Sequence, residues 1–343
     1  MHEPLHVLFH TCGNHAIGMG HVVRSLALAQ ALEESPESVQ IRFAVQEVGE
    51  GVRQIESCGF PVRLWDEPDP LQPDVAVIDV PNPNVEFFKK LREAGVLTVS
   101  VDDPGPARYA ADLAFSMLYA PAATRPLGCG TREFGGFGYF ALQQGFANLP
   151  PKGIHERAYR VLVAQGGSDT YGVLPRICKV LRQMQRDLDV NVIVGPAFQH
   201  NADLQGSIGT DPRFSIRRQP ASRVAIMQET DLAVSAAGIT AFELAAAGVP
   251  MLLLVSEPKE VETAVSLAHE GAAVYPGHSS HVSDDSLTAA ITALLDDPVR
   301  RRALSRRGQA LVDGHGARRV IDAILAHTRT MWKVGEARGS GGK

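Results

Sequence analysis

The stretch Gly18-Met-Gly-His-Val-Val-Arg24 separates two patterns that together predict the start of an α/β fold. Before it, the apolar run His6-Val-Leu-Phe-His10 has the length of a buried strand rather than a helix. After it, apolar residues from Val22 to Leu32 recur every three or four positions, as they do on one face of a helix. The stretch is therefore predicted to be the loop of a strand-loop-helix unit.

The residues of this loop are suited to binding an anion and moving a proton. Gly18 and Gly20 allow positive φ angles and close approach of a ligand, and the helix start offers free N–H groups. His21 carries a ring that transfers protons near neutral pH, and Arg24 follows one turn later. The alternative is that His21 caps or packs the loop and that Arg24 is a solvated helix charge. For a histidine considered alone this alternative is favoured. The choice between a catalytic and a structural His21 therefore depends on the rest of the sequence.

Length and composition describe an ordinary globular protein. At 343 residues the chain exceeds the usual size of one hydrophobic core, so two domains are expected. The formal net charge of -5 argues against nucleic acid as a partner. The basic clusters Arg300-Arg-Arg302 and Arg306-Arg307 follow Asp297-Pro298 and are interpreted as a solvated helix face. The four cysteines form no C-x-x-C pair, so no zinc site is expected and the thiols are expected to be reduced.

The first half alternates strand-like and helix-like segments, which favours parallel sheets with crossover helices. The further expected strands are 41–45, 62–64, 75–79 and 97–101, and the expected helices are 22–34, 50–58 and 84–94. Residues 104 to 150 are rich in Pro, Gly and aromatic residues, and Asn148-Leu-Pro-Pro-Lys-Gly153 is interpreted as a linker.

The second half repeats this plan. A strand at 160–164 leads into Gln165-Gly-Gly-Ser-Asp169, and a helix follows at about 174–186. The later expected strands are 190–194, 231–235 and 251–255, and the later expected helices are 240–247, 260–270, 284–296, 298–312 and 317–330. The expected domains are therefore 1–150 and 151–333, with a disordered tail at 334–343.

Two loops of the second half follow strands, and ligands bind open α/β sheets at the carboxyl ends of strands. Gly166-Gly-Ser-Asp169 offers N–H groups and a hydroxyl to a phosphate, with the dipole of the next helix behind it. Ser235-Ala-Ala-Gly-Ile-Thr-Ala-Phe-Glu243 leaves room for a phosphate or ribose, and Glu243 could bind sugar hydroxyls. The alternatives are that Ser168 or Asp169 caps a helix and that Glu243 is an ordinary surface residue.

Together these motifs resemble GT-B enzymes that act on nucleotide sugars. The resemblance covers almost the whole chain and rests on Gly-x-Gly-His-x-x-Arg, Gly-Gly-Ser-Asp and Ala-Ala-Gly-x-Thr-x-x-Glu, and on the ending Val312-Asp-Gly-His-Gly-Ala-Arg-Arg-Val320. Within that class the chain is most similar to the spore-coat polysaccharide glycosyltransferases and to the UDP-sugar hydrolase of pseudaminic acid synthesis. The peptidoglycan UDP-N-acetylglucosamine transferase is more distant. The resemblance implies two Rossmann-like domains whose parallel sheets face a central cleft.

The resemblance also implies roles for individual residues. His21 is expected to be the general base, and Asp103, which with Asp102 matches an Asp-Asp pair in the relatives, to join it in catalysis. Both aspartates could instead end the strand and cap the turn at Pro104. The residues expected to contact the substrate are Gly18, Gly20, Arg24, Asp79 and Asp102. Those expected to bind the nucleotide are Gly166, Gly167, Ser168, Asp169, Ala237, Gly238, Thr240 and Glu243, the last through the ribose hydroxyls.

The chain also departs from these relatives. Val80-Pro-Asn-Pro83 stands where the hydrolase-like pattern has an aromatic Tyr-Gly, which weakens the case for hydrolysis. Lys259-Glu-Val-Glu262 stands where relatives carry side-chain amides, and carboxylates there would repel a diphosphate. Asp187-Leu-Asp189 satisfies the D-x-D spacing of metal-dependent transferases, but it lies away from the strand ends and is interpreted as a solvated turn. We therefore expect neither a metal nor another cofactor.

The leading hypothesis is a cytoplasmic, metal-independent GT-B glycosyltransferase of polysaccharide biosynthesis. It would take a sugar from a nucleotide-sugar donor, UDP-linked, to the hydroxyl or amine of a small-molecule or glycan acceptor. The alternative hypotheses are a nucleotide-sugar hydrolase, in which His21 activates water, and a non-catalytic nucleotide-sugar sensor or partner subunit. No signal peptide or membrane span is expected, and membrane contact is expected only if the acceptor is lipid-linked.

Overall fold

The computed structural model describes residues 3–14, 17–65, 72–118, 130–195, 197–218, 220 and 222–340, the last ten by their backbone alone. The chain divides into two compact units. The first comprises Met1–Gly13, His21–Gln144 and His315–Lys343, and the second comprises Asn14–Gly20 and Gly145–Gly314. The C-terminal segment is thus grouped with the first unit, whereas the sequence pattern placed it at the end of the second domain.

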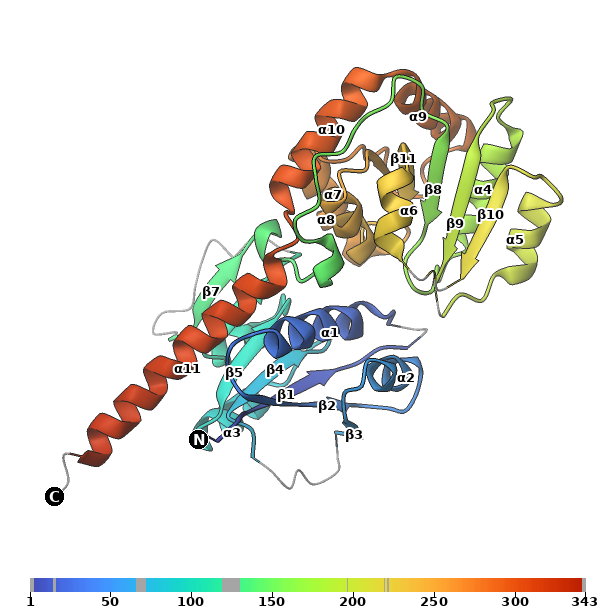
Figure 1. Cartoon of the computed structure of the whole chain (residues 1–343). Coiled ribbons are helices and arrows are strands. Elements are labelled where there is room, and N and C mark those ends of the chain that lie inside the picture. The colour runs from blue at the N-terminus through green and yellow to red at the C-terminus, as the bar shows by residue number, and fades with distance from the viewer. Residues whose placement is uncertain are drawn as a thin grey trace. The chain divides into compact units, whose positions relative to one another are not determined.

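A seven-stranded parallel sheet organises the described part of the first unit (Figure 1). Its order is β3-β2-β1-β4-β5-β6-β7. The strands are β1 (Leu5–Thr11), β2 (Val39–Val45), β3 (Val62–Leu64), β4 (Val75–Asp79), β5 (Leu97–Val101), β6 (Leu113–Ser116) and β7 (Arg132–Gly135). Strands β4, β5 and β6 are buried along their whole length, as expected of parallel strands covered on both faces.

The helices of this unit connect and cover the sheet. They are α1 (Gly20–Glu33), α2 (Glu50–Ser57), α3 (Val85–Glu93) and α11 (Gly316–Ser340), with short 3-10 turns η1 (Pro106–Ala110), η2 (Phe137–Tyr139) and η3 (Gln144–Phe146), the last reaching past the boundary between the units. Helix α11 is held to the unit by Arg319, whose Nη1 donates to the Gly138 carbonyl at 2.8 Å, and by an ion pair between Arg329 and Glu37. It also continues through residues 334–340, for which a disordered tail was predicted.

A five-stranded parallel sheet forms the centre of the second unit, again counting only described residues. Its order is β10-β9-β8-β11-β12. The strands are β8 (Arg160–Ala164), β9 (Asp189–Val194), β10 (Phe214–Arg218), β11 (Leu232–Ser235) and β12 (Met251–Leu253). The helices are α4 (Val173–Gln183), α5 (Asn201–Ile208), α6 (Arg223–Glu229), α7 (Ile239–Ala246), α8 (Pro258–His269), α9 (Asp284–Asp296) and α10 (Pro298–Leu311).

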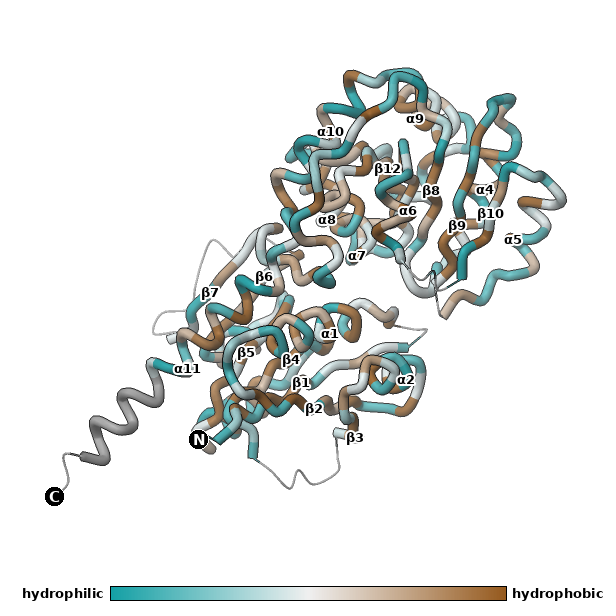
Figure 2. The backbone as a smooth tube through the Cα atoms, in the orientation of Figure 1, coloured by the Kyte–Doolittle hydropathy of each residue, from teal (hydrophilic) through white to brown (hydrophobic). Residues whose placement is uncertain are grey.

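The core of the second unit lies between its sheet and the apolar faces of its helices. One continuous cluster joins the inner residues of β8, β9 and β11 to the buried faces of α4, α5 and α9. Figure 2 shows the same arrangement by hydropathy, with apolar strands inside and helices whose outer faces are polar. The faces of the second sheet are thus covered by helices, and a ligand would bind at the ends of its strands.

Each sheet has a topological switch point, which is where such folds bind ligands. In the first unit the chain runs outward from β1 to β3 and then returns to β4 on the other side of β1. In the second unit it runs from β8 to β10 and returns to β11 on the other side of β8. The carboxyl ends of β1 and β4, and of β8 and β11, are therefore the two places to search for a site.

Most predicted elements are confirmed, including the strands at 75–79, 97–101 and 160–164. The sequence pattern missed β6, β7, β10, α5 and α6. Strands β6 and β7 fall in the segment rich in Pro, Gly and aromatic residues. The apolar run of β6, Leu113–Phe115, and the alternating part of β10, Phe214–Ile216, are each only three residues long, which is too short a signal to mark a strand. Two parallel α/β sheets nevertheless confirm the predicted fold class.

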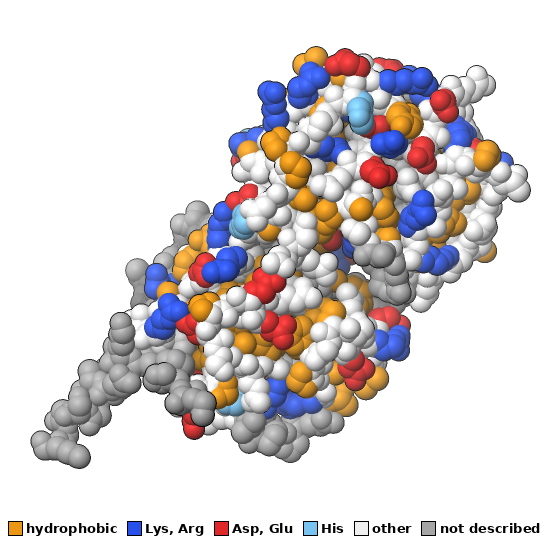
Figure 3. Space-filling view, viewed as in Figure 1, with side chains coloured by type: hydrophobic (Ala, Val, Ile, Leu, Met, Phe, Trp, Pro, Cys, Tyr) orange, Lys and Arg blue, Asp and Glu red, His pale blue; other side chains and the backbone are white. Residues whose placement is uncertain are grey.

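The visible surface carries charges of both signs. Figure 3 shows Lys and Arg interspersed with Asp and Glu over the face in view, without a uniformly basic area. Within the described residues, no helix is both long and apolar enough to cross a membrane.

Candidate functional site

The switch point of the first unit brings His21 and Asp79 together. Asp79 is the last residue of β4 and His21 the second residue of α1, and His21 Nδ1 lies 2.7 Å from Asp79 Oδ1. Asp79 is fully buried, whereas a quarter of the His21 side chain is exposed. Burial by itself would raise the pKa of Asp79, but the Arg24 guanidinium and His21 outweigh burial and hold that pKa below its usual value.

This contact determines which ring nitrogen of His21 carries the proton. An ionised carboxylate has no proton to donate, so Nδ1 of His21 must be the donor in the hydrogen bond to Asp79. In a neutral ring Nε2 is then the acceptor, free to take a proton from a substrate. A histidine oriented by a buried carboxylate has the arrangement of a general base.

Arg24 joins the ends of three elements. Its Nε and Nη2 donate to the two oxygens of Asp79 at 2.8 and 2.6 Å, and its Nη1 lies 2.6 Å from Asp102 Oδ2. The side chain is only 3% exposed, so the interpretation of Arg24 as a solvated helix charge is wrong. The paired guanidinium locks the first turn of α1 against β4 and the residue after β5, and thereby fixes the position of His21.

Asp102 is the residue that receives this guanidinium after β5. Its Oδ1 also accepts the N–H groups of Met117 and Leu118, at 2.5 and 2.9 Å. Burial raises the pKa of Asp102, an effect that Arg24 partly offsets. Its φ of 49° lies in the left-handed region, which Asp tolerates better than most residues.

Asp103, expected to be catalytic, has a different environment from Asp102. Its Oδ1 accepts the N–H of Gly105 and its Oδ2 the N–H of Arg108, both at 2.8 Å. Both oxygens thus cap the turn that begins η1, which is the alternative considered for this residue. The structure therefore brings Arg24, Asp79, Asp102 and His21 together and leaves Asp103 to a local turn.

Of the two glycines before His21, Gly18 has the positive φ that glycine allows and Gly20 does not. Gly18 has a φ of 82°, and its N–H donates to the Asn14 carbonyl at 2.9 Å in a tight turn. Gly20 is the first residue of α1. Residues 15 and 16 lie outside the described residues. The positive φ makes Gly18 necessary at its position, because a Cβ would be strained there.

The loop after β8 in the second unit caps its own helix. Gly166 has a φ of 71°, and Asp169 accepts the N–H groups of Val173 and Leu174 at 2.8 and 2.9 Å. The carboxylate occupies the start of α4, so the expectation that the dipole of α4 is open to a phosphate is wrong. Burial raises the pKa of Asp169 to about 6, although these two hydrogen bonds oppose the rise. Ser168 Oγ lies 3.1 Å from Thr170 Oγ1.

The start of α7, after β11, is the helix terminus that remains suited to an anion. Its N-cap is Gly238, and no side chain in the described structure caps the helix. Ala237, Gly238 and Thr240, which were predicted to bind the nucleotide, lie at this terminus. Uncapped N–H groups and the positive end of the dipole stabilise negative charge there.

Glu243 lies one turn further along α7 and is almost fully buried, so its interpretation as an ordinary surface residue is wrong. Its Oε2 lies 2.6 Å from an Nη2 of Arg223 on α6, and the same Nη2 donates to Thr240 Oγ1 at 3.0 Å. Burial raises the pKa of Glu243, and Arg223 opposes the rise. Sequence reasoning missed Arg223, because nothing in the local pattern of α6 marks it as the partner of α7.

Two further polar atoms at this switch point have no partner among the described residues. They are Nε2 of Gln165, just after β8, and Oγ of Ser235, the last residue of β11. Because β8 and β11 are paired, both groups lie at the same edge of the sheet. Buried polar groups are normally hydrogen-bonded. The lack of hydrogen-bond partners for Gln165 Nε2 and Ser235 Oγ is therefore consistent with a ligand that binds both atoms at this strand end.

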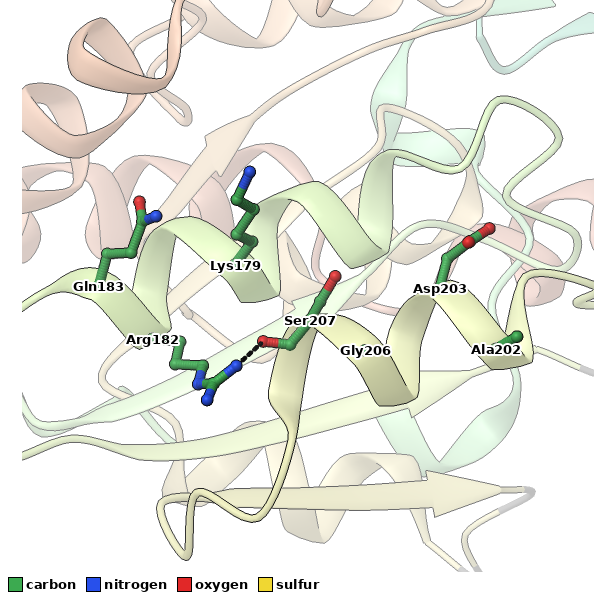
Figure 4. Close-up of a pocket in the computed structure, with 7 residues that line it drawn as sticks. All are labelled: Lys179, Arg182, Gln183, Ala202, Asp203, Gly206 and Ser207. Carbon is green, nitrogen blue, oxygen red and sulfur yellow. Dashed lines mark hydrogen bonds between the residues drawn. The ribbon is translucent and has the colours of Figure 1, made fainter.

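Other candidate regions lack these features. Asp187 is 87% exposed and Asp189 begins β9, at the amino edge of the sheet, which agrees with the interpretation of D-x-D as a solvated turn. No cluster of three metal-ligating side chains occurs in the described structure. A hollow lies between the C-terminal half of α4 and α5 (Figure 4), and none of its described lining residues has a buried polar atom without a partner. Its lining residues are Lys179, Arg182, Gln183, Ala202, Asp203, Gly206 and Ser207.

Known proteins resemble this chain over most of its length. No protein-family model matches it. The spore coat polysaccharide biosynthesis protein SpsG of Bacillus subtilis is 26% identical over 336 residues, which cover 94% of this chain and 98% of SpsG. The uncharacterized protein MJ1062 of Methanocaldococcus jannaschii is 27% identical over 263 residues. That match covers 71% of this chain, and the chain spans about half of MJ1062, 54% of its length.

Solved structures share the fold at low sequence identity. MurG of Acinetobacter baumannii has a TM-score of 0.67 at 17% identity, covering 94% of this chain and 100% of MurG. The spinosyn rhamnosyltransferase SpnG has a TM-score of 0.64 at 17% identity, covering 92% and 99%. A putative UDP-N-acetylglucosamine 2-epimerase from Listeria monocytogenes has a TM-score of 0.61 at 14% identity, covering 96% and 98%.

The two parallel sheets and these likenesses define the GT-B fold. The fold implied by the resemblance in the glycine, histidine and glutamate motifs is thereby confirmed. Among proteins with curated names, the chain is similar along nearly its whole length to SpsG.

Proposed function

We propose that this protein is a cytoplasmic glycosyltransferase that moves a sugar from a nucleotide-sugar donor to the hydroxyl or amine of an acceptor. The donor is proposed to be UDP-linked, and His21 to be the general base. The observation that carries the proposal is the hydrogen bond between His21 Nδ1 and buried Asp79, which leaves Nε2 as a proton acceptor at the switch point of the first sheet.

In the proposed reaction His21 Nε2 takes the proton of the acceptor as the acceptor oxygen or nitrogen attacks the anomeric carbon. The bond from that carbon to the diphosphate breaks, and the nucleoside diphosphate leaves with the bonding electrons. Asp79 stabilises the imidazolium that forms, and the paired Arg24 keeps Asp79 ionised. Asp103 has no part in this scheme, because both of its oxygens are used by a turn.

The second unit is proposed to bind the nucleotide. The uncapped start of α7 would bind the diphosphate, and Glu243 would accept hydrogen bonds from the ribose hydroxyls. Arg223, already paired with Glu243, supplies positive charge beside the leaving group without a metal. The open polar atoms of Gln165 and Ser235 support the assignment, since a bound nucleotide could satisfy both.

The likeness to SpsG supports an acceptor on the way to a polysaccharide, since that protein is described as belonging to spore coat polysaccharide biosynthesis. The rhamnosyltransferase SpnG shows that the same fold carries glycosyl transfer in a protein of this size range. Neither relative identifies the sugar, so the donor has to be found by experiment.

The test is to incubate the protein with UDP-, dTDP-, GDP- and CMP-sugars and an acceptor panel, and to identify the products by mass spectrometry. His21→Ala is compared with His155→Ala. His155 Nδ1 also contacts a carboxylate, Asp231 Oδ1 at 2.8 Å, but Asp231 precedes β11 at the amino edge of its sheet. We expect transfer by the wild type and His155→Ala, and a loss of about 10²- to 10⁴-fold in His21→Ala with nucleotide affinity kept.

Three results would contradict the proposal. Free sugar and nucleotide without an acceptor would identify the hydrolase, in which His21 activates water. Tight nucleotide binding with no turnover, unchanged in His21→Ala, would identify a non-catalytic sensor. Equal losses in the two histidine variants would show that His21 has no special role.

A further inference from the structure

Glu260, in the first turn of α8, faces the start of α7. Its Oε1 lies 3.4 Å from the position that a Cβ on Gly238 would occupy, so the carboxyl group lies directly against the N-cap of α7. The backbone amide of Ala237 interacts with the same carboxyl group. Its Oε2 is closed off from solvent and has no hydrogen-bond partner in the described part of the chain. An open, buried carboxyl oxygen therefore adjoins the helix terminus most suited to an anion.

The charged groups around Glu260 disfavour its ionised form. They are Glu257 and Lys259 in its own helix turn, which pair with each other at 2.7 Å, and Asp169 at the start of α4. Burial, followed by the charges of Glu257 and Asp169, raises the pKa of Glu260 to about 7, against the opposing effects of Lys259 and the Ala237 amide. Glu260 thus exchanges its proton in the neutral pH range.

The two protonation states have opposite effects on an anion. A carboxylate beside a diphosphate repels it and offers only acceptors to phosphate oxygens, which are themselves acceptors. A carboxylic acid is neutral and offers one O–H donor, so it can play the part that a side-chain amide plays. The unsatisfied Oε2 is the atom from which that donor could extend.

We propose that Glu260 recognises the donor diphosphate as a neutral carboxylic acid, whose O–H donates to a phosphate oxygen at the start of α7, and that ionisation of Glu260 weakens donor binding. This inference rests on the proposed function, because it takes the diphosphate to bind at α7. Under this proposal Glu260 is a specificity-determining residue. The affinity for the donor depends on pH because Glu260 ionises.

The test uses the full chain and calorimetry. UDP, dTDP, GDP and CDP are first titrated at pH 6, and the tightest ligand is then measured between pH 6 and 8. The variants are Glu260→Gln, which keeps a donor without ionisation, Glu260→Ala, which removes it, and Glu262→Gln, an exposed control on the same helix. The ionisation of the ligand affects the wild type and the three variants equally. The ratio of the Kd of the wild type to that of a variant therefore isolates the contribution of Glu260 to the pH dependence of binding.

We expect the Kd of the wild type and of Glu262→Gln to rise about tenfold from pH 6 to pH 8 relative to Glu260→Gln, as follows from a group that titrates near pH 7. Glu260→Ala is expected to bind weakly at both pH values. The wild type is also expected to take up protons on binding near pH 7.5, beyond the uptake by Glu260→Gln. If Glu260→Gln is unstable, the proton uptake of the wild type and the Kd of Glu260→Ala at the two pH values still test the inference.

Binding that strengthens with pH through Glu260 would overturn the inference, because Glu260 would then act as a carboxylate that accepts from sugar hydroxyls. Parallel pH profiles in the wild type and Glu260→Gln would overturn it as well, while leaving the proposed function intact. If no nucleotide binds the wild type at any pH, the proposed function fails and the inference fails with it.

Discussion

His21 Nδ1 and Asp79 Oδ1 lie 2.7 Å apart although 58 residues separate them in the chain. The first turn of α1 carries His21 and the end of β4 carries Asp79, and the pairing of β1 with β4 brings them together. A similar contact, between His155 Nδ1 and Asp231 Oδ1, occurs at the edge of the second sheet where the strands begin. The difference matters because open α/β sheets bind ligands at the carboxyl edge, so position in the sheet gives the first pair its candidate catalytic role.

The guanidinium of Arg24 is expected to be the main electrostatic support of this site. In Arg24→Met two buried carboxylates lose their cation, so the free energy of unfolding at pH 7 is expected to fall by about 3–5 kcal/mol. Chemical denaturation measures this loss. Arg53→Met is the control, since Arg53 is 68% exposed and pairs with Glu50 on its own helix, and it is expected to change stability little.

The loss in Arg24→Met is also expected to depend on pH. Arg24 contributes to holding the pKa of Asp79 below its ordinary value, so the stabilisation is present above the unfolded pKa and is lost as pH falls through the folded one. The stability difference between wild type and variant should therefore shrink as the pH is lowered below about 4. A difference independent of pH would contradict the assignment of charge to Asp79.

Gly195 is expected to support the loop Gly166–Asp169, which follows β8 in the second unit. A Cβ at Gly195 would come within 2.6 Å of the Gly166 carbonyl oxygen and closer still to Gly167, so Gly195→Ala must displace that loop. We expect a loss of stability of about 1–3 kcal/mol and weaker nucleotide binding. Gly206→Ala, on α5, has nothing within 4 Å of the new methyl group and should be neutral or stabilising. Equal thermal denaturation of the two variants would refute this role.

Glu243 is expected to reduce stability at high pH while contributing to nucleotide binding. Burial raises its folded pKa, so the wild type loses stability as pH rises through that value, whereas Glu243→Gln has no such group. The Tm of Glu243→Gln relative to the wild type should therefore increase with pH. Its affinity for UDP should fall about tenfold or more by calorimetry, because a ribose contact is lost. Unchanged affinity would remove Glu243 from the nucleotide site.

Arg301 corrects the interpretation of the basic clusters on α10. It is 1% exposed rather than solvated, and its guanidinium donates to the carbonyls of Leu294, Leu295, His155 and Glu156. These bonds join the end of α9 to the segment that leads into β8. Arg301→Met leaves four carbonyls without a donor and is expected to destabilise the second unit by several kcal/mol. Exposed Arg300→Met should have little effect, and similar denaturation curves for the two would disprove the assigned role.

The sequence by itself determined most of the strands and helices and the loops at which a ligand could bind. Buried parallel strands are continuous apolar runs, amphipathic helices repeat at 3.6 residues, and glycines mark the turns, so each signal lies within about fifteen residues. The loops at Gly18–His21, Gly166–Asp169 and Ser235–Glu243 were found in this way, as were the two α/β halves. The GT-B fold was implied by the resemblance that the motifs in these loops carry.

Only the tertiary structure decided which charges are buried and what holds them. Arg24 is a buried bridge because strand pairing brings Asp79 and Asp102 to one helix turn, and Glu243 is buried because Arg223 reaches it from another helix. Asp103 and Asp169 were both expected in the site, but their carboxylates accept hydrogen bonds from nearby backbone N–H groups. The environment of an ionisable group depends on partners far away in the chain, and periodicity carries no information about those partners.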